Sequence, residues 1–179
     1  MSKKSRSAGP DWKLPAPLRL ARPGEIGIWK FSDMLYIAAD HAGFQLKETL
    51  KDFLAKEGYE VIDLGAEELD LADDYPDFAM ELAKQVAQDE NAGGILICGT
   101  GQGMCMVANK VAGIRAVMVH NDFTAKDAAD HLNANVICLG GRVTDGETAK
   151  KLVKIWLDTE FSEDERHIRR LRKIAEMEE

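Results

Sequence analysis

Residues 93–104 read Gly-Gly-Ile-Leu-Ile-Cys-Gly-Thr-Gly-Gln-Gly-Met. The apolar run Ile95–Ile97 is bounded by glycines, which is typical of a short buried strand. The strand ends at Cys98, and a loop with Gly99, Gly101 and Gly103 leads into a helical pattern. A thiol at such a turn lies beside backbone N–H groups at a helix N-terminus, which favour a thiolate and bind anions. The segment is therefore able to hold a base and an oxyanion site, although it also fits a tight turn without a ligand and a buried, inert cysteine.

From Met34 onward, short apolar strands alternate with helical patterns. The expected strands are 35–39, 60–64, 94–98, 115–119 and 136–139. The expected helices are 44–56, 78–88, 103–110, 125–131, 147–157 and 166–177. This order predicts an α/β fold, a Rossmann-like three-layer α/β/α sandwich with a five-stranded parallel sheet. Ligands of such sheets bind outside the carboxyl ends of the strands, so the residues that follow each strand matter most.

Residues 1–33 differ in composition from the rest of the chain. They contain four of the five prolines, and seven Lys or Arg against three Asp or Glu. We interpret this segment as an N-terminal extension, flexible or loosely packed, and residues 34–179 as one domain. Met34 opens the domain and is a hypothetical alternative translation start.

Charge and composition exclude several classes of function. The net charge is −8, and because the extension carries +4, the domain carries −12, which opposes nucleic-acid binding. No apolar run approaches the roughly 20 residues of a membrane span, and the N-terminus lacks the apolar stretch of a secretory signal. Three cysteines without metal-ligand spacing indicate a reducing cytoplasm and no metal.

Two further strand ends carry polar or glycine-rich chemistry. Asp40 and His41 follow the first strand, and Arg142 follows two glycines after the fifth. Asp40 is placed either to cap a helix, with His41 solvated, or to bond substrate hydroxyls while His41 holds an anion. His131 lies near a helix end, where it either favours the helix dipole or moves protons near neutral pH.

Residues 166–173 place five permanent cations in eight positions. Arg166 and Arg170 are four apart and share a helix face, and paired guanidinium groups match a phosphate. Arg142 is positioned to add a third. The alternative is a solvated helix face balanced by the acidic C-terminus.

Together these segments resemble the ribose-5-phosphate isomerase B family, which includes galactose-6-phosphate isomerase subunits. The resemblance covers about residues 34–174 and rests on several ordered motifs. These motifs are Ala39–Gly43, Asp74–Ala79, Ile97–Gly103, Ala108–Lys110, Gly113–Ala116, Ala134–Val136, Leu139–Arg142 and Arg166-His167.

The resemblance implies a sugar-phosphate isomerase domain that needs no cofactor, with a site shared between subunits of a homodimer or dimer of dimers. It implies that Cys98 shuttles a proton between C1 and C2, and that Thr100 and His131 assist ring opening. The implied substrate-binding residues are Asp40, His41, Tyr75, Gly99, Gly101, Gly103, Asn109, Arg142, Arg166 and Arg170. A second branch of the family uses a glutamate after the glycine loop, but Met104 stands there, which leaves Cys98 as the evident base.

The chain departs from the family pattern at two places. Leu132 replaces a polar residue after His131, and acidic residues 163–165 precede Arg166 where glycines are usual. The expected reaction is interconversion of ribose 5-phosphate and ribulose 5-phosphate. The alternatives are the same chemistry on galactose 6-phosphate or allose 6-phosphate, a non-catalytic sugar-phosphate-binding protein, and a flavodoxin-like nucleotide binder.

Overall fold

The computed structural model describes residues 34–89 and 91–178, so the predicted extension 1–33 lies outside the described residues. Five strands form one sheet in the order β2-β1-β3-β5-β4, and every adjacent pair is parallel. Their bounds are β1 Met34–Ala39, β2 Glu60–Asp63, β3 Gly93–Cys98, β4 Ala116–Met118 and β5 Val136–Gly140.

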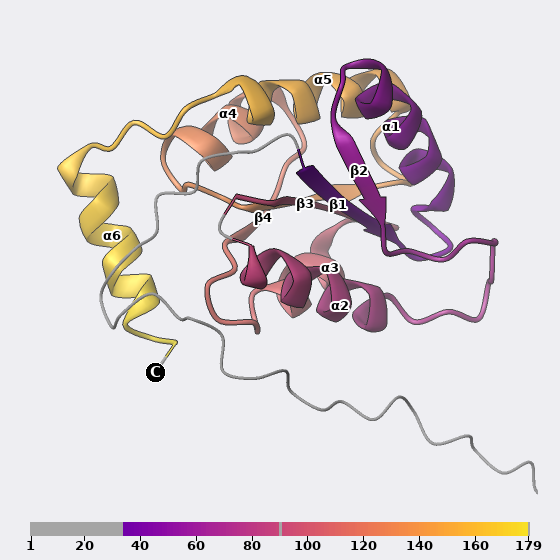
Figure 1. The fold of residues 1–179 in the computed structure, drawn as a ribbon, viewed down its shortest axis with the longest axis horizontal. Helices are drawn as coiled ribbons and strands as arrows, with labels where there is room; N and C mark the ends of the chain where they lie inside the picture. The colour runs from indigo at the N-terminus through magenta and orange to yellow at the C-terminus, as the bar shows by residue number, and fades with distance from the viewer. Residues whose placement is uncertain (1–33, 90, 179) are drawn as a thin grey trace, which may run out of the picture.

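Helices cover both faces of this sheet (Figure 1). Their bounds are α1 Phe44–Lys56, α2 Tyr75–Gln88, α3 Gln102–Ala108, α4 Asp122–Asp130, α5 Gly146–Asp158 and α6 Glu165–Ala175. One face packs against α1, α4 and α5, and the other against α2 and α3, while α6 lies at the β4 end of the molecule (Figure 1). The predicted three-layer α/β/α fold is confirmed.

The burial of the central strand β3 explains why its sequence is a continuous apolar run. All six of its residues are buried. Ile95 and Ile97 point into the core beneath α1 and α5, whereas Leu96 and Cys98 point into the core beneath α2 and α3. A strand that is buried on both faces needs apolar side chains at successive positions, so it shows no alternation of polar and apolar residues.

The helix α2 begins earlier than its sequence pattern indicates. We expected a loop through Pro76 and a helix from Phe78, but the helix begins at Tyr75. Proline fits the first turn of a helix because its missing N–H group would have had no intrahelical partner there. The earlier start places the Tyr75 side chain at the carboxyl edge of the sheet, beside the loop that follows Cys98.

The strand order places a topological switch point at the centre of the sheet. From β1 the chain runs outward to β2, and it then returns across β1 to β3 on the other side. Crevices at such points lie outside the carboxyl ends of the strands. Asp40 follows β1 and Cys98 ends β3, so the two residues flank this switch point.

Among the described residues, no helix is long and apolar enough to cross a membrane.

Candidate active site

Glycines bring three strand ends into backbone contact at the carboxyl edge of the sheet. A Cβ atom on Gly43 would lie 2.5 Å from the carbonyl oxygen of Ile97, and one on Gly141 would lie 2.5 Å from that of Ala42. A Cβ atom on Gly140 would lie 2.9 Å from the Thr100 backbone. The loops after β1, β3 and β5 therefore form one surface, as expected for a ligand site in this fold.

Cys98 lies where this surface meets α3. Its Sγ accepts a hydrogen bond from the Gly101 N–H group over 3.2 Å. Gly101 adopts a φ of 81°, a conformation that favours glycine, and this turns its amide back toward the sulfur. This hydrogen bond fixes the position of the Cys98 sulfur at the start of the glycine loop. The side chain is buried but not sealed, with 5% of the residue exposed.

The other two thiols lie on the same side of the sheet as Cys98, in the core beneath α2 and α3. Burial and a hydrogen bond with Cys105 raise the pKa of Cys138 well above its ordinary value, so Cys138 stays a neutral thiol. The hydrogen bond with Cys138 lowers the pKa of Cys105, whose Sγ also lies 3.3 Å from the carbonyl oxygen of Ala116. Both thiols therefore bond within the core, and Cys98 is the cysteine at the strand-end surface.

Asp40 is buried and organises the turn that begins α1. Its Oδ1 accepts hydrogen bonds from the N–H groups of Ala42 at 2.9 Å and Gly43 at 3.1 Å. Asp40 is therefore not the helix cap considered above, because the N-cap of α1 is Gly43, which has no side-chain hydrogen bond; Asp40 stabilises the turn before the helix. His41 is not simply solvated, because its Nδ1 lies 2.6 Å from Oδ1 of Asp73. Asp73 was not anticipated from the sequence, since it lies in a polar loop without periodicity.

Tyr75 and Arg142 border the loop that follows Cys98. A Cβ atom on Gly103 would lie 2.8 Å from the Tyr75 ring, and one on Gly99 would lie 3.4 Å from the Arg142 guanidinium group. Both side chains are exposed, as is Thr100 within the loop. The structure therefore gathers nine predicted site residues at one edge, namely Asp40, His41, Tyr75, Cys98, Gly99, Thr100, Gly101, Gly103 and Arg142.

His131 lies at the amino edge of the sheet, where the strands begin, whereas Cys98 of the same chain lies at the carboxyl edge. It follows α4 and precedes Val136, which pairs with Gly94, whereas Cys98 pairs with Gly140. The four steps along the strand from Gly94 to Cys98 span about 13 Å. The His131 ring lies 4.1 Å from that of His167 on α6, and its Nδ1 forms an ion pair with Asp127.

The predicted phosphate-binding arginines of α6 lie on the same side of the sheet's carboxyl–amino axis as His131, away from Cys98. Arg166 and Arg170 are exposed and flank the buried His167, and Arg166 lies 3.4 Å from Asp164. A single chain therefore carries two groups of predicted site residues, one at each edge of the sheet.

Asn109 is not brought to the loop after Cys98. Its Oδ1 accepts from the Ala116 N–H group at 2.9 Å, and its Nδ2 donates to the carbonyl oxygens of Ala116 at 2.8 Å and Cys105 at 3.0 Å. The side chain thus joins the end of α3 to the start of β4. This geometry gives Asn109 a structural role at the amino edge of the sheet.

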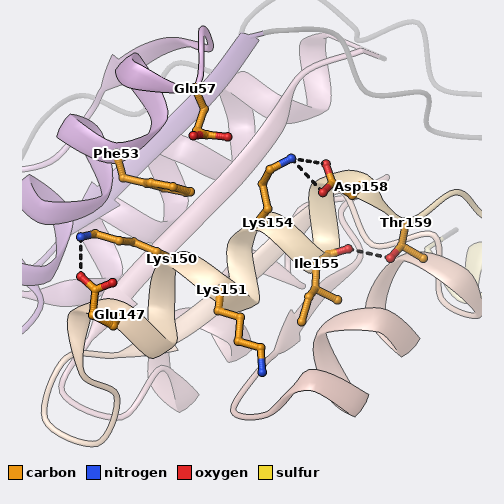
Figure 2. A pocket seen from close by; sticks show the side chains of 9 residues that line it. All are labelled: Phe53, Glu57, Glu147, Lys150, Lys151, Lys154, Ile155, Asp158 and Thr159. Carbon is orange, nitrogen blue, oxygen red and sulfur yellow. Dashed lines mark hydrogen bonds and ion pairs between the residues drawn. The ribbon is translucent and has the colours of Figure 1, made fainter.

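A separate groove lies between α1 and α5 (Figure 2). Its charged side chains pair along α5, with Lys150 2.7 Å from Glu147 and Lys154 2.6 Å from Asp158. It contains none of the predicted site residues. The groove is therefore distinct from the candidate active site.

One group of acidic residues and a histidine has the composition of a metal site. Among the described residues, Asp40, His41 and Asp73 place potential ligand atoms within 4.8 Å of one another. However, His41 Nδ1 already shares a hydrogen bond with Asp73, and Asp40 Oδ1 accepts two backbone amides. These bonds account for the cluster as part of the organisation of the site.

Comparison with known proteins identifies the class to which this fold and site belong. A family model described as Ribose/Galactose Isomerase matches residues 35–174. The chain belongs to this family, and among its relatives are proteins named ribose-5-phosphate isomerase B.

Individual relatives agree with this assignment. A probable ribose-5-phosphate isomerase B of Mycoplasma pneumoniae is 46% identical over 140 residues, which is 78% of this chain and 91% of that protein. The D-erythrulose-4-phosphate isomerase of Pectobacterium atrosepticum is 45% identical over 125 residues, 70% of this chain and 82% of that protein. The structure of ribose-5-phosphate isomerase B from Mycoplasma genitalium with bound ribulose 5-phosphate aligns with a TM-score of 0.79 and 42% identity, covering 83% of this chain and 97% of that one.

Proposed function

We propose that this protein interconverts ribose 5-phosphate and ribulose 5-phosphate, with Cys98 as the base. The observation that carries the proposal is the Cys98 sulfur, held by the Gly101 amide at the convergence of three strand ends. A similar structure with bound ribulose 5-phosphate supports the choice of substrate.

The reaction follows from a thiolate facing an open-chain aldose phosphate. The sulfur removes the proton from C2, the electron pair forms the C1–C2 double bond, and the carbonyl oxygen at C1 becomes an oxyanion that takes a proton. The 2-hydroxyl then loses its proton, and C1 takes back the proton held by the sulfur, which gives the ketose. In this proposal, backbone amides of the Gly99–Gly103 loop other than that of Gly101 stabilise the oxyanion, and such donors typically contribute about 10²–10³ in rate.

The site is completed by a second copy of the chain. His131, Arg166 and Arg170 carry the ring-opening and phosphate-binding roles, yet they lie at the edge opposite Cys98. In a homodimer that joins opposite edges, each site takes Cys98 and Thr100 from one subunit and His131 with the arginines from the other. Exposed apolar side chains on segments that follow the strands, at Met106, Phe123 and Val143, suit such an interface.

A shorter or longer sugar phosphate is the second candidate substrate. A four-carbon substrate is favoured by the similarity to the D-erythrulose-4-phosphate isomerase. Leu132 also replaces a polar side chain next to His131, which removes a hydrogen-bonding group near the sugar. Three free cysteines suit a reducing cytoplasm as the location of the protein.

A coupled isomerase assay across four-, five- and six-carbon aldose phosphates tests the proposal. We expect the highest kcat/KM with ribose 5-phosphate. A higher kcat/KM with a four- or six-carbon substrate would move the assignment to that sugar. Binding without turnover of any of them would instead support a sugar-phosphate-binding protein.

A further inference from the structure

Asp73 makes an unexpected contact with the candidate active site. It lies in the polar loop between β2 and α2, which is otherwise largely exposed. Its Oδ1 lies 2.6 Å from Nδ1 of His41 and accepts a second hydrogen bond from the His41 N–H group at 3.2 Å. One carboxylate oxygen therefore holds both the ring and the backbone of His41. This geometry fixes the imidazole relative to the strand end that bears it.

The two side chains that form this contact differ in burial. The Asp73 side chain is 7% exposed, whereas the His41 side chain is 26% exposed. A ligand at this edge thus reaches the ring and not the carboxylate. Oδ2 of Asp73 is buried without a hydrogen-bond partner, and among the described residues the ion pair of Asp73 is with His41. A buried carboxylate in this state depends on the hydrogen that Nδ1 of His41 offers it.

We infer that Asp73 is a positioning residue that acts through His41. A carboxylate that accepts from Nδ1 fixes the hydrogen on that nitrogen and presents Nε2 to the ligand. His41 then meets the phosphate or the sugar hydroxyls with a defined ring orientation. The polar loop after β2 becomes part of the active site through this one residue. The inference rests on the proposed function, in which His41 contacts the sugar phosphate.

Steady-state kinetics test this role. Asp73→Ala should raise the KM for ribose 5-phosphate about tenfold and change kcat less than about twofold, since a freely rotating ring loses a bond to the bound ligand. Asp73→Asn should give an intermediate KM, because its carbonyl oxygen still accepts from Nδ1. Asp70→Ala is the matched control, since Asp70 lies in the same loop, bonds the Ala72 N–H group and is exposed. Its KM should equal that of the unaltered enzyme.

A double-mutant cycle separates positioning from loop stability. In a His41→Ala background, Asp73→Ala should change KM less than about twofold, because the residue through which Asp73 acts is gone. An equal rise in KM in both backgrounds, or an unchanged KM in the single variant, would overturn the inference. If Asp73→Ala fails to fold, the same cycle can be run with Asp73→Asn.

Nitrogen-15 NMR of His41 supplies a readout that does not need turnover. Nδ1 of His41 should carry hydrogen in the unaltered protein, and Asp73→Ala should shift the ring toward the form protonated at Nε2 alone. A bare Nδ1 in the unaltered protein would refute the inference whatever the enzyme's activity. Conversely, a protein that shows the expected spectra but turns over no sugar phosphate would refute the proposed function and leave the Asp73–His41 contact standing.

Discussion

At the scale of single residues, the site depends on glycines where the backbone approaches itself. Gly141 faces the carbonyl oxygen of Ala42, and Gly43 faces that of Ile97, each at 2.5 Å from the position of a Cβ atom. No side chain fits at such distances, so these glycines set the spacing of the loops. The sequence indicated that these glycines follow strands, at the positions where ligands bind in this fold. Their contacts with the backbone of neighbouring loops could not be predicted from it.

Gly141→Ala should therefore separate the loops after β1 and β5. We expect a loss of about 1–3 kcal/mol in the free energy of unfolding, as for other overpacked sites, together with a large fall in kcat/KM. Thermal denaturation and the isomerase assay measure the two effects. Gly146→Ala is the control, because a Cβ atom there meets its nearest neighbour, the Thr49 methyl group, at 3.3 Å in the first turn of α5. Equal stability and activity in Gly141→Ala and Gly146→Ala would contradict this account of the strand ends.

Asp73 is a residue of the candidate site that could not be predicted from the sequence. Cys98, Asp40 and Arg142 could be found because each lies at or just after the end of a strand with a recognisable pattern. Asp73 lies in an irregular loop among other acidic residues, directly before the Asp74–Ala79 motif but outside it. Its importance arises from a contact with His41, which is 32 positions away along the chain.

At the scale of elements, apolar periodicity predicted all the strands and helices of the described residues, with shifts at their ends. The pattern missed the start of α2 because the polar residues before Phe78 carry no apolar repeat. On α6 the charge pattern was ambiguous, since five cations fit a phosphate clamp or a solvated face. In the structure His167 and Leu171 are buried and Arg166 and Arg170 are exposed, an arrangement that fits both interpretations.

Arg166→Ala and Arg170→Ala should each raise the KM for ribose 5-phosphate about tenfold or more, because each removes a charge-assisted hydrogen bond to phosphate. Arg169→Ala is the matched control, since it removes an exposed arginine of the same helix from outside the i, i+4 pair. Its KM should stay unchanged. If all three variants behave alike, the basic surface of α6 serves solubility rather than substrate binding.

At the scale of the whole molecule, the strand order decides which residues share a site. Residues 98 and 131 both belong to the predicted catalytic set, but parallel strands place them at opposite edges of the sheet. Periodicity indicates that strands exist and says nothing of their order, so this separation could not be derived from the residues. The family resemblance anticipated a site shared between subunits, and the separation is the structural reason to propose one.

Mixing two inactive variants tests the shared site. Cys98→Ala and the double variant Arg166→Ala with Arg170→Ala should each be nearly inactive at low substrate concentration. After unfolding and refolding together in equal amounts, the mixture should regain about a quarter of the unaltered activity, because about half of the dimers are mixed and one of the two sites in each mixed dimer is intact. Each variant refolded with itself serves as the control. A mixture that stays inactive while mixed dimers form would place the whole site within one subunit.

The most direct test of the central claim is the turnover number of Cys98→Ala with ribose 5-phosphate, measured beside the affinity of that variant for the substrate. Removal of a general base should lower kcat about 10²–10⁴-fold and leave the dissociation constant nearly unchanged. Cys105→Ala, which removes a neighbouring thiol that bonds within the core, should keep its turnover. A kcat in Cys98→Ala close to that of the unaltered enzyme would contradict the assignment of Cys98 as the base.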